Sequence, residues 1–261
     1  MIDAKFAARV AAALPPTSAV IEIGAGTGTL TAALVRRART VTALEIDRDL
    51  VEILHERFAA EGGHLHIVPG DALEFDFAKR LRAERAPRAI CGNLPYNITT
   101  PLIERIVACA DVWEASVFMV QREYGRRLSA APKTPEYGSL TLFVGHYCRC
   151  EKLFDIGAAG FYPRPNIAST VVRLVPRPDR LEGVPDEPLL LWLIRAAFAQ
   201  RRKMLAKSAA SHANDPQARG FIEQAMRSAG ISETARAEEL GLDDFRRVAR
   251  ALKEAGFAAP G

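Results

Sequence analysis

The segment Glu22-Ile23-Gly24-Ala25-Gly26-Thr27-Gly28 constrains the fold of this chain more than any other. It closes an apolar, strand-like run and precedes a helix-length stretch, Leu30–Arg37. Glycines in such a turn let the backbone approach a ligand, and the following helix presents its N-terminal N–H groups. The spacing departs from the dinucleotide fingerprint GxGxxG, because position 29 is Thr and the third glycine is Gly28.

ExGxGxG instead resembles the first motif of class I S-adenosylmethionine-dependent methyltransferases. A dinucleotide enzyme and a purely structural turn stay open as alternatives here.

Strand-like and helix-length runs alternate through residues 1–120, which is typical of an α/β domain with a mostly parallel sheet. The expected strands are Val20–Gly24, Thr40–Glu45, His64–Val68, Ala89–Gly92 and Ala115–Val120, and the expected helices are Leu30–Arg37, Asp49–Ala60, Phe75–Arg85 and Pro101–Cys109. Two further β-like runs, Ser139–Cys150 and Ser169–Val175, are expected to complete the sheet as an antiparallel edge.

Prolines at 176, 178, 185 and 188 then interrupt regular structure, and the chain beyond them has helical periodicity. We therefore expect a Rossmann-like domain at residues 1–176 and a small all-α domain at residues 177–261. Hydrophobic residues make up 49% and charged residues 25%, an ordinary globular composition with a net charge of +4. No apolar stretch of about 18 residues and no signal-peptide pattern occurs, so a cytoplasmic protein is expected.

Acidic residues follow the next two expected strands. Glu45 closes the second apolar run, about twenty residues after the glycines, where a carboxylate can accept hydrogen bonds from both ribose hydroxyls of a nucleotide. Asp71 follows the third run and is expected to accept a hydrogen bond from the amino group of the cofactor's adenine. Either acid alone could be a helix N-cap. Their succession at strand ends favours a cofactor site.

The sequence Asn93-Leu94-Pro95-Tyr96 follows the fourth expected strand. The exocyclic amine of adenine is a poor nucleophile, because its lone pair is delocalised into the ring. The Asn93 side-chain oxygen and the Leu94 carbonyl could accept hydrogen bonds from that amine, with Pro95 fixing the direction of the loop. Tyr96 offers a flat face on which an extruded base can stack. An ordinary β-turn is the alternative for this tetrapeptide taken alone.

Together these motifs closely resemble the ribosomal RNA adenine N6,N6-dimethyltransferases. The matching segments span nearly the whole chain: Glu22–Gly28, Glu45, Gly70–Ala72, Asn93–Tyr96, Phe161–Pro165 with Ser169, and Ala197–Leu205. The resemblance implies that S-adenosylmethionine is the cofactor and that Phe161 is the second aromatic wall of the base pocket, opposite Tyr96. The implied cofactor-binding residues are Glu22, Gly24, Gly26, Glu45, Asp71 and Asn93.

The resemblance further implies dimethylation of two adjacent adenosines near the 3′ end of 16S rRNA, during maturation of the small ribosomal subunit. The alternatives are a large-subunit rRNA adenine methyltransferase of the macrolide-resistance type and a non-catalytic RNA-binding assembly factor. We expect a monomer without a membrane partner. We also expect no metal, since the histidines and cysteines lack ligand spacing. Relatives usually begin with a Gly-Gln-(Asn/His)-Phe-Leu segment, on which we expect cofactor affinity to depend, and this sequence starts just after that point.

Two basic clusters are expected to contact RNA phosphates. Arg122, Arg126 and Arg127 follow the fifth strand, and Arg201, Arg202 and Lys203 lie in an expected single helical stretch from Arg195 to Lys207. Solvated helix faces are the alternative for either cluster. If the clusters do bind phosphates, recognition would depend on RNA shape and splayed-out bases.

Overall fold

The fold is given by a computed structural model, which describes residues 3–157, 168–215 and 217–259. The chain divides into two compact units. Unit 1 comprises residues 1–125 and 148–176, and unit 2 comprises residues 126–147 and 177–261. The division after residue 176 coincides with the expected domain boundary. Residues 126–147 differ from that expectation, because they group with the C-terminal helices.

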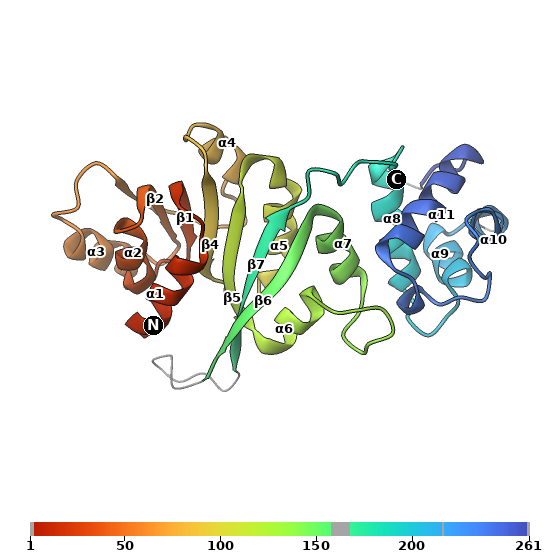
Figure 1. The fold of residues 1–261 in the computed structure, drawn as a ribbon, viewed down its shortest axis with the longest axis horizontal. Coiled ribbons are helices and arrows are strands. Elements are labelled where there is room, and N and C mark those ends of the chain that lie inside the picture. Colours follow the sequence, from red (N-terminus) through yellow and green to blue (C-terminus); the bar gives the residue numbers. More distant parts are fainter. Residues whose placement is uncertain (1–2, 158–167, 216, 260–261) are drawn as a thin grey trace. The chain divides into compact units, whose positions relative to one another are not determined.

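Unit 1 is built on one seven-stranded sheet with the order β3-β2-β1-β4-β5-β7-β6 (Figure 1). Pairing is parallel from β3 to β5 and antiparallel from β5 through β7 to β6, as expected from the sequence. The strands are β1 (Thr17–Ile23), β2 (Ala38–Glu45), β3 (Leu65–Pro69), β4 (Arg88–Asn93), β5 (Ala115–Gln121), β6 (Cys148–Ile156) and β7 (Ser169–Pro176).

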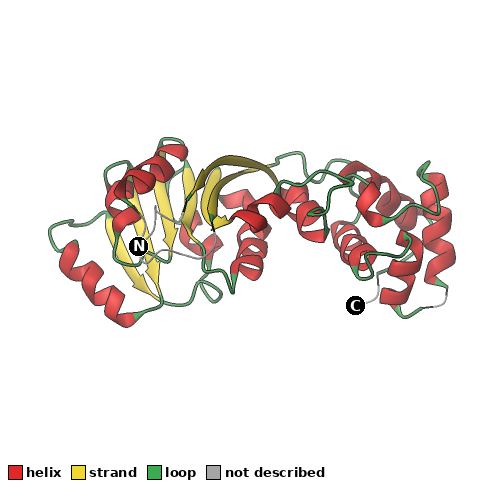
Figure 2. Ribbon diagram, turned by 90° about the horizontal axis from the view of Figure 1, so that it is seen from below, coloured by secondary structure: helices red, strands yellow, loops and turns green. Residues whose placement is uncertain are grey.

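Helices flank this sheet (Figure 2) and connect its parallel strands. They are α1 (Ala4–Ala13), α2 (Thr29–Val35), α3 (Arg48–Arg57), α4 (Phe77–Arg82), α5 (Thr99–Ala108) and the 3₁₀ turn η1 (Ala110–Val112). α6 (Arg122–Leu128) begins in unit 1 and ends in unit 2. The central strands are buried on both faces, so their apolar runs are nearly continuous. Because the parallel strands share one direction, their carboxyl ends meet at one edge of the sheet, where ligands bind in open α/β folds.

The expected strand over Ser139–Cys150 is wrong for most of its length. Residues Ser139–Tyr147 form a helix, α7, and only the residues from Cys148 onward belong to β6. α7 is buried nearly all round, so its sequence shows no polar face to reveal a helical period. Short apolar runs of this kind cannot be assigned to helix or strand by periodicity alone.

Unit 2 is helical, as the sequence predicts for its C-terminal part. Its helices beyond α7 are α8 (Glu187–Phe198), α9 (Leu205–Ala213), α10 (Ala218–Ser228), the 3₁₀ turn η3 (Ala237–Glu239) and α11 (Leu242–Glu254). They enclose one core that includes Leu193, Ile222, Phe245 and Leu252. The expected single helical stretch from Arg195 to Lys207 is interrupted, because α8 ends at Phe198 and α9 begins at Leu205.

Within the part of the chain that the structure describes, no helix is long and apolar enough to cross a membrane.

Candidate cofactor and base site

The glycine turn between β1 and α2 adopts a conformation that side chains would strain. Gly24, Gly26 and Gly28 have φ angles of +67°, +58° and +82°, which L-residues with a side chain rarely adopt. A Cβ on Gly28 would lie 2.4 Å from Cε2 of Phe58, so this glycine is required by packing. A Cβ on Gly26 would meet nothing within 4 Å. The turn is therefore packed on one side and open at Gly26, which suits a loop that a ligand approaches.

The Glu45 carboxylate holds this turn against the end of β2. Its Oε2 accepts a hydrogen bond of 2.7 Å from the Gly26 N–H. Its Oε1 accepts from the N–H groups of Ile46 and Asp47, at 3.0 and 3.1 Å. Asp47 has a separate task, because its side chain caps α3 by accepting from the N–H groups of Asp49 and Leu50. Glu45 thus contacts the glycine turn, whereas Asp47 caps the next helix.

Glu22 lies buried at the base of the turn. It is 1% exposed, and its Oε2 accepts a hydrogen bond of 2.6 Å from the Thr31 hydroxyl on α2. Burial, reinforced by the nearby charge of Glu45, raises the pKa of Glu22 from 4.5 to about 8. The structure thus gives Glu22 a supporting contact, because it links β1 to the first turn of α2; its expected contact with the cofactor stays a prediction.

Asp71 and the loop after β4 lie at the ends of their strands, as expected. Oδ1 of Asp71 accepts a hydrogen bond of 2.8 Å from the Leu73 N–H, which leaves its second oxygen for another donor. The Leu94 N–H donates to the carbonyl of Met119 on β5 at 3.0 Å, extending the β4–β5 pairing by one residue. The Asn93 side chain is exposed. A Cβ on Gly24 would lie 3.6 Å from the Asn93 carbonyl, so the glycine turn and the Asn93 loop are neighbours.

The loop that carries Tyr96 is fixed at its base. The Pro95 carbonyl accepts a hydrogen bond of 2.7 Å from the buried Thr99 hydroxyl and one of 3.3 Å from the Ile98 N–H. Tyr96 is 43% exposed, and its hydroxyl lies 3.3 Å from Oγ of Ser169. Among the described residues, neither the Asn93 side chain nor the Leu94 carbonyl has a hydrogen-bond partner in the protein. Of the two, Asn93 is exposed, whereas Leu94 is only 1% exposed.

One residue that sequence reasoning missed is Ile46, which directly follows Glu45. Its side chain is 66% exposed, the largest exposed fraction among the exposed large hydrophobic residues of the described chain. An apolar side chain beside the Glu45 carboxylate offers a surface that can cover a flat heteroaromatic ring. Its position after the strand-end acid is the signal that could have identified it. Phe161, the expected second aromatic wall, lies outside the described residues.

The expected RNA-contact residues fall into different environments. Arg122, Arg126 and Arg127 are exposed on α6. Arg202 and Lys203 are exposed in the turn between α8 and α9, with no ion pair in the described chain. Arg201 instead pairs with Glu238 at 3.2 Å and donates to the carbonyls of Pro135 and Tyr137 at 2.6 and 3.2 Å. The placement of Arg201 in a phosphate-binding cluster is thus weakened, because its guanidinium joins segments of unit 2.

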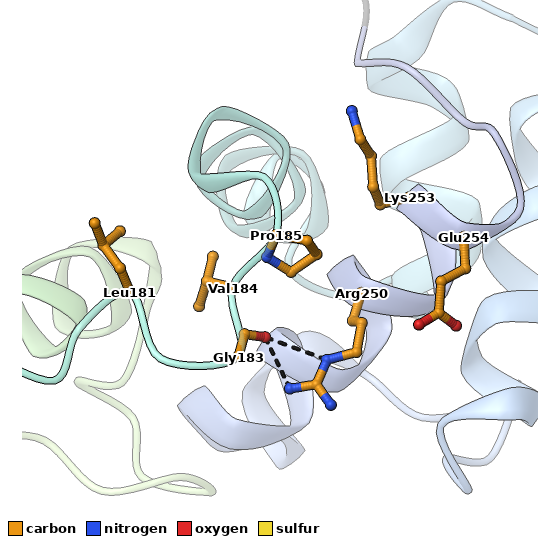
Figure 3. Close-up of a pocket in the computed structure, with 7 residues that line it drawn as sticks. All are labelled: Leu181, Gly183, Val184, Pro185, Arg250, Lys253 and Glu254. Carbon is orange, nitrogen blue, oxygen red and sulfur yellow. Dashed lines mark hydrogen bonds between the residues drawn. The ribbon is translucent and has the colours of Figure 1, made fainter.

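A cavity of about 370 Å³ lies in unit 2 (Figure 3). Arg250 lines it and donates two hydrogen bonds to the Gly183 carbonyl, at 3.2 and 2.8 Å. Its lining residues are Leu181, Gly183, Val184, Pro185, Arg250, Lys253 and Glu254. No group of three or more potential metal ligands occurs within the described ranges.

The strand order, the glycine turn after β1 and the carboxylate after β2 define the fold of a class I S-adenosylmethionine-dependent methyltransferase. The family model for ribosomal RNA adenine dimethylase matches residues 2–254. The chain belongs to this family.

Named relatives agree with the family assignment. The Ribosomal RNA small subunit methyltransferase A of Methylococcus capsulatus is 40% identical over 242 residues, covering 91% of this chain and 88% of the relative. The protein of the same name from Pseudomonas fluorescens is 36% identical over 241 residues, covering 92% and 85%.

Solved structures extend the likeness to both units. A dimethyladenosine transferase from Plasmodium falciparum superposes with a TM-score of 0.81 at 23% identity, covering 96% of this chain and 95% of that one. The 23S rRNA methyltransferase ErmE superposes with a TM-score of 0.69 at 25% identity, covering 96% and 98%. The higher TM-score belongs to the dimethyladenosine transferase, although its low identity limits that comparison to the fold.

Proposed function

We propose that this chain transfers methyl groups from S-adenosylmethionine to N6 of two adjacent adenosines near the 3′ end of 16S rRNA, during maturation of the small ribosomal subunit. The observation that carries the proposal is the loop after β4. The exposed Asn93 side chain has no hydrogen-bond partner among the described residues there, and it lies in the same loop as the exposed ring of Tyr96, next to the glycine turn. Family membership and the small-subunit relatives support adenine in rRNA as the substrate.

The residues around the glycine turn fit S-adenosylmethionine, which supplies an electrophilic methyl group on a sulfonium. The open side of Gly26 leaves room for close approach to the backbone, and the Glu45 carboxylate stands where ribose hydroxyls are bound in nucleotide folds. Ile46 offers an apolar surface for the adenine ring, and Asp71 offers an acceptor for the adenine amino group. These residues would bind the cofactor, whereas Glu22 and Thr31 support the turn from beneath.

The Asn93 loop would act on the substrate. Acceptance of hydrogen bonds by the Asn93 side chain and the Leu94 carbonyl draws the target nitrogen toward tetrahedral geometry and makes its lone pair available. Stacking of the extruded base on Tyr96 contributes about 1–3 kcal/mol by analogy with other base–aromatic contacts. The chain needs no covalent nucleophile for this reaction, because positioning and local electrostatics supply the catalysis.

The test uses labelled S-adenosylmethionine with three substrates: immature small subunits, naked 16S rRNA and 23S rRNA. Mapping of N6,N6-dimethyladenosine to two adjacent positions near the 3′ end of 16S rRNA is the expected result. Label in 23S rRNA alone would assign a large-subunit activity. The absence of label from every substrate, together with retained RNA binding, would indicate a non-catalytic assembly factor.

A further inference from the structure

Tyr96 is joined to a residue far away in the sequence. Its hydroxyl lies 3.3 Å from Oγ of Ser169, the first residue of β7, across 73 positions of the chain. Tyr96 is 43% exposed, whereas Ser169 is fully buried. The pair therefore connects a solvent-facing ring to the interior of the sheet.

Ser169 occupies a rigid position. β7 lies between β5 and β6, and Ser169 pairs with Gln121 on one side and with Ile156 on the other. A buried hydroxyl is costly unless it makes a hydrogen bond. Within the described chain, the Tyr96 hydroxyl is the hydrogen-bond partner of the Ser169 side chain. The far end of the ring is thus anchored to the sheet, while the other end is fixed by the loop that Thr99 holds.

We propose that Ser169 is a positioning residue, which holds the far end of the Tyr96 ring in one place so that the ring is ready for the target adenine. This inference rests on the proposed function of the Asn93 loop. An exposed tyrosine side chain can change its χ1 rotamer, which swings the whole ring and its hydroxyl to another place. A hydrogen bond at the hydroxyl removes that freedom before the base arrives, and pre-organisation of this kind favours the reactive geometry.

A double-mutant cycle on the full chain tests the inference, with Ser169→Ala, Tyr96→Phe and the combined variant. Each single change should lower kcat on immature small subunits by about 3- to 10-fold, the size expected for one neutral hydrogen bond. The combined variant should lose no more than either single one, because both remove the same bond. KM for the cofactor should not change. Independent, multiplying losses would overturn the proposal.

Ser116→Ala is the matched control. Ser116 is a fully buried serine in the same sheet, on β5, and its Oγ has no hydrogen-bond partner in the described part of the chain. Its replacement should leave kcat unchanged, and a loss equal to that of Ser169→Ala would mean that any buried serine in the sheet has this effect. Unfolding by urea should show that all variants are folded at the assay temperature.

A readout without methyl transfer separates this inference from the proposed function. An RNA hairpin from the 3′ end of 16S rRNA carries 2-aminopurine at a target position, and stacking on Tyr96 should quench its fluorescence. Ser169→Ala and Tyr96→Phe should each reduce the quenching, while Ser116→Ala should not. Reduced quenching in a protein that methylates nothing would preserve the positioning role and refute the enzymatic one. Unchanged quenching in Ser169→Ala would refute the positioning role even if the protein is active.

Discussion

The Gly26 N–H donates to Oε2 of Glu45 at 2.7 Å, so the glycine turn after β1 is held by the residue that ends β2. The same carboxylate accepts two further N–H groups through Oε1. A carboxylate has about four acceptor sites, and these three N–H groups use three of them, so one site on Oε2 is left for a further donor. Glu45 can therefore shape the turn and still accept one more hydrogen bond.

Replacement of Glu45 should weaken cofactor binding strongly. Glu45→Gln puts an NH₂ group where an oxygen now faces a backbone N–H, so one hydrogen bond becomes a repulsion between donors. We expect the Kd for S-adenosylmethionine to rise by at least about 10-fold, since bonds to a charged acceptor contribute about 1.5–3 kcal/mol. Isothermal titration calorimetry measures this Kd in the wild type and the variant. Asp47→Asn is the control, because asparagine caps a helix as well as aspartate does, and its Kd should not change.

Glu22 should make the protein less stable as the pH rises. Its pKa is near 8 in the folded chain and near 4.5 when it is solvated. Between these values the folded state holds a proton that the unfolded state has released, so stability falls by up to about 1.4 kcal/mol per pH unit. Below pH 4.5 and above pH 8 this group contributes no slope.

The variant Glu22→Gln tests this, because glutamine is uncharged and can still accept from Thr31. Its free energy of unfolding in urea should exceed that of the wild type by more at pH 8 than at pH 5.5. An equal difference at both pH values would show that Glu22 does not titrate in this range. Cofactor affinity should change less than in Glu45→Gln, since Glu22 is buried.

Tyr96→Ala should separate catalysis from cofactor binding. Loss of the ring removes the stacking surface, and kcat/KM for methylation should fall by about 10- to 100-fold, the equivalent of about 1–3 kcal/mol. The Kd for S-adenosylmethionine should stay within about 2-fold of the wild type, because the glycine turn does not depend on this side chain for its hydrogen bonds. Tyr96→Phe keeps the ring and should lose much less activity. A collapse of cofactor affinity in Tyr96→Ala would refute this division of roles.

The sequence was most informative where local rules act. The glycine turn, the acids at strand ends and the Asn93 loop could all be located, because a parallel sheet brings the ends of its strands to one edge. Burial was harder to foresee. Glu22 has the same spacing as a ligand-facing acid, yet its strand is internal and its side chain points to Thr31. The sequence of α7 predicts a strand, because its apolar residues face neighbours on all sides and show no helical period.

Sequence patterns also do not predict side-chain hydrogen bonds between residues that are far apart in the chain. Arg201 was grouped with its neighbours by charge alone, and its hydrogen bonds reach residues about 64–66 positions away. The family resemblance includes Ser169 but does not predict its hydrogen bond to Tyr96. That bond depends on the position of β7 beside β5 in the sheet. Tertiary packing determines such long-range contacts, and the secondary-structure propensity of the local sequence does not predict them.

The turn between α8 and α9 should contribute to RNA affinity through Arg202 and Lys203 and not through Arg201. The first two side chains are exposed without an ion pair in the described chain, so RNA phosphates can bind them without breaking an existing contact. Arg201 would have to give up Glu238 and two carbonyls. Each phosphate contact steepens the dependence of log K on log salt by about 0.7–0.9. The double variant Arg202→Ala/Lys203→Ala should thus reduce the slope by about 1.4–1.8, as measured by filter binding of 16S rRNA from 50 to 300 mM salt.

Arg201→Ala should instead lower the free energy of unfolding and leave the slope unchanged. An equal change of slope in Arg201→Ala would restore it to the phosphate-binding cluster, because the side chain must then leave Glu238 when RNA binds.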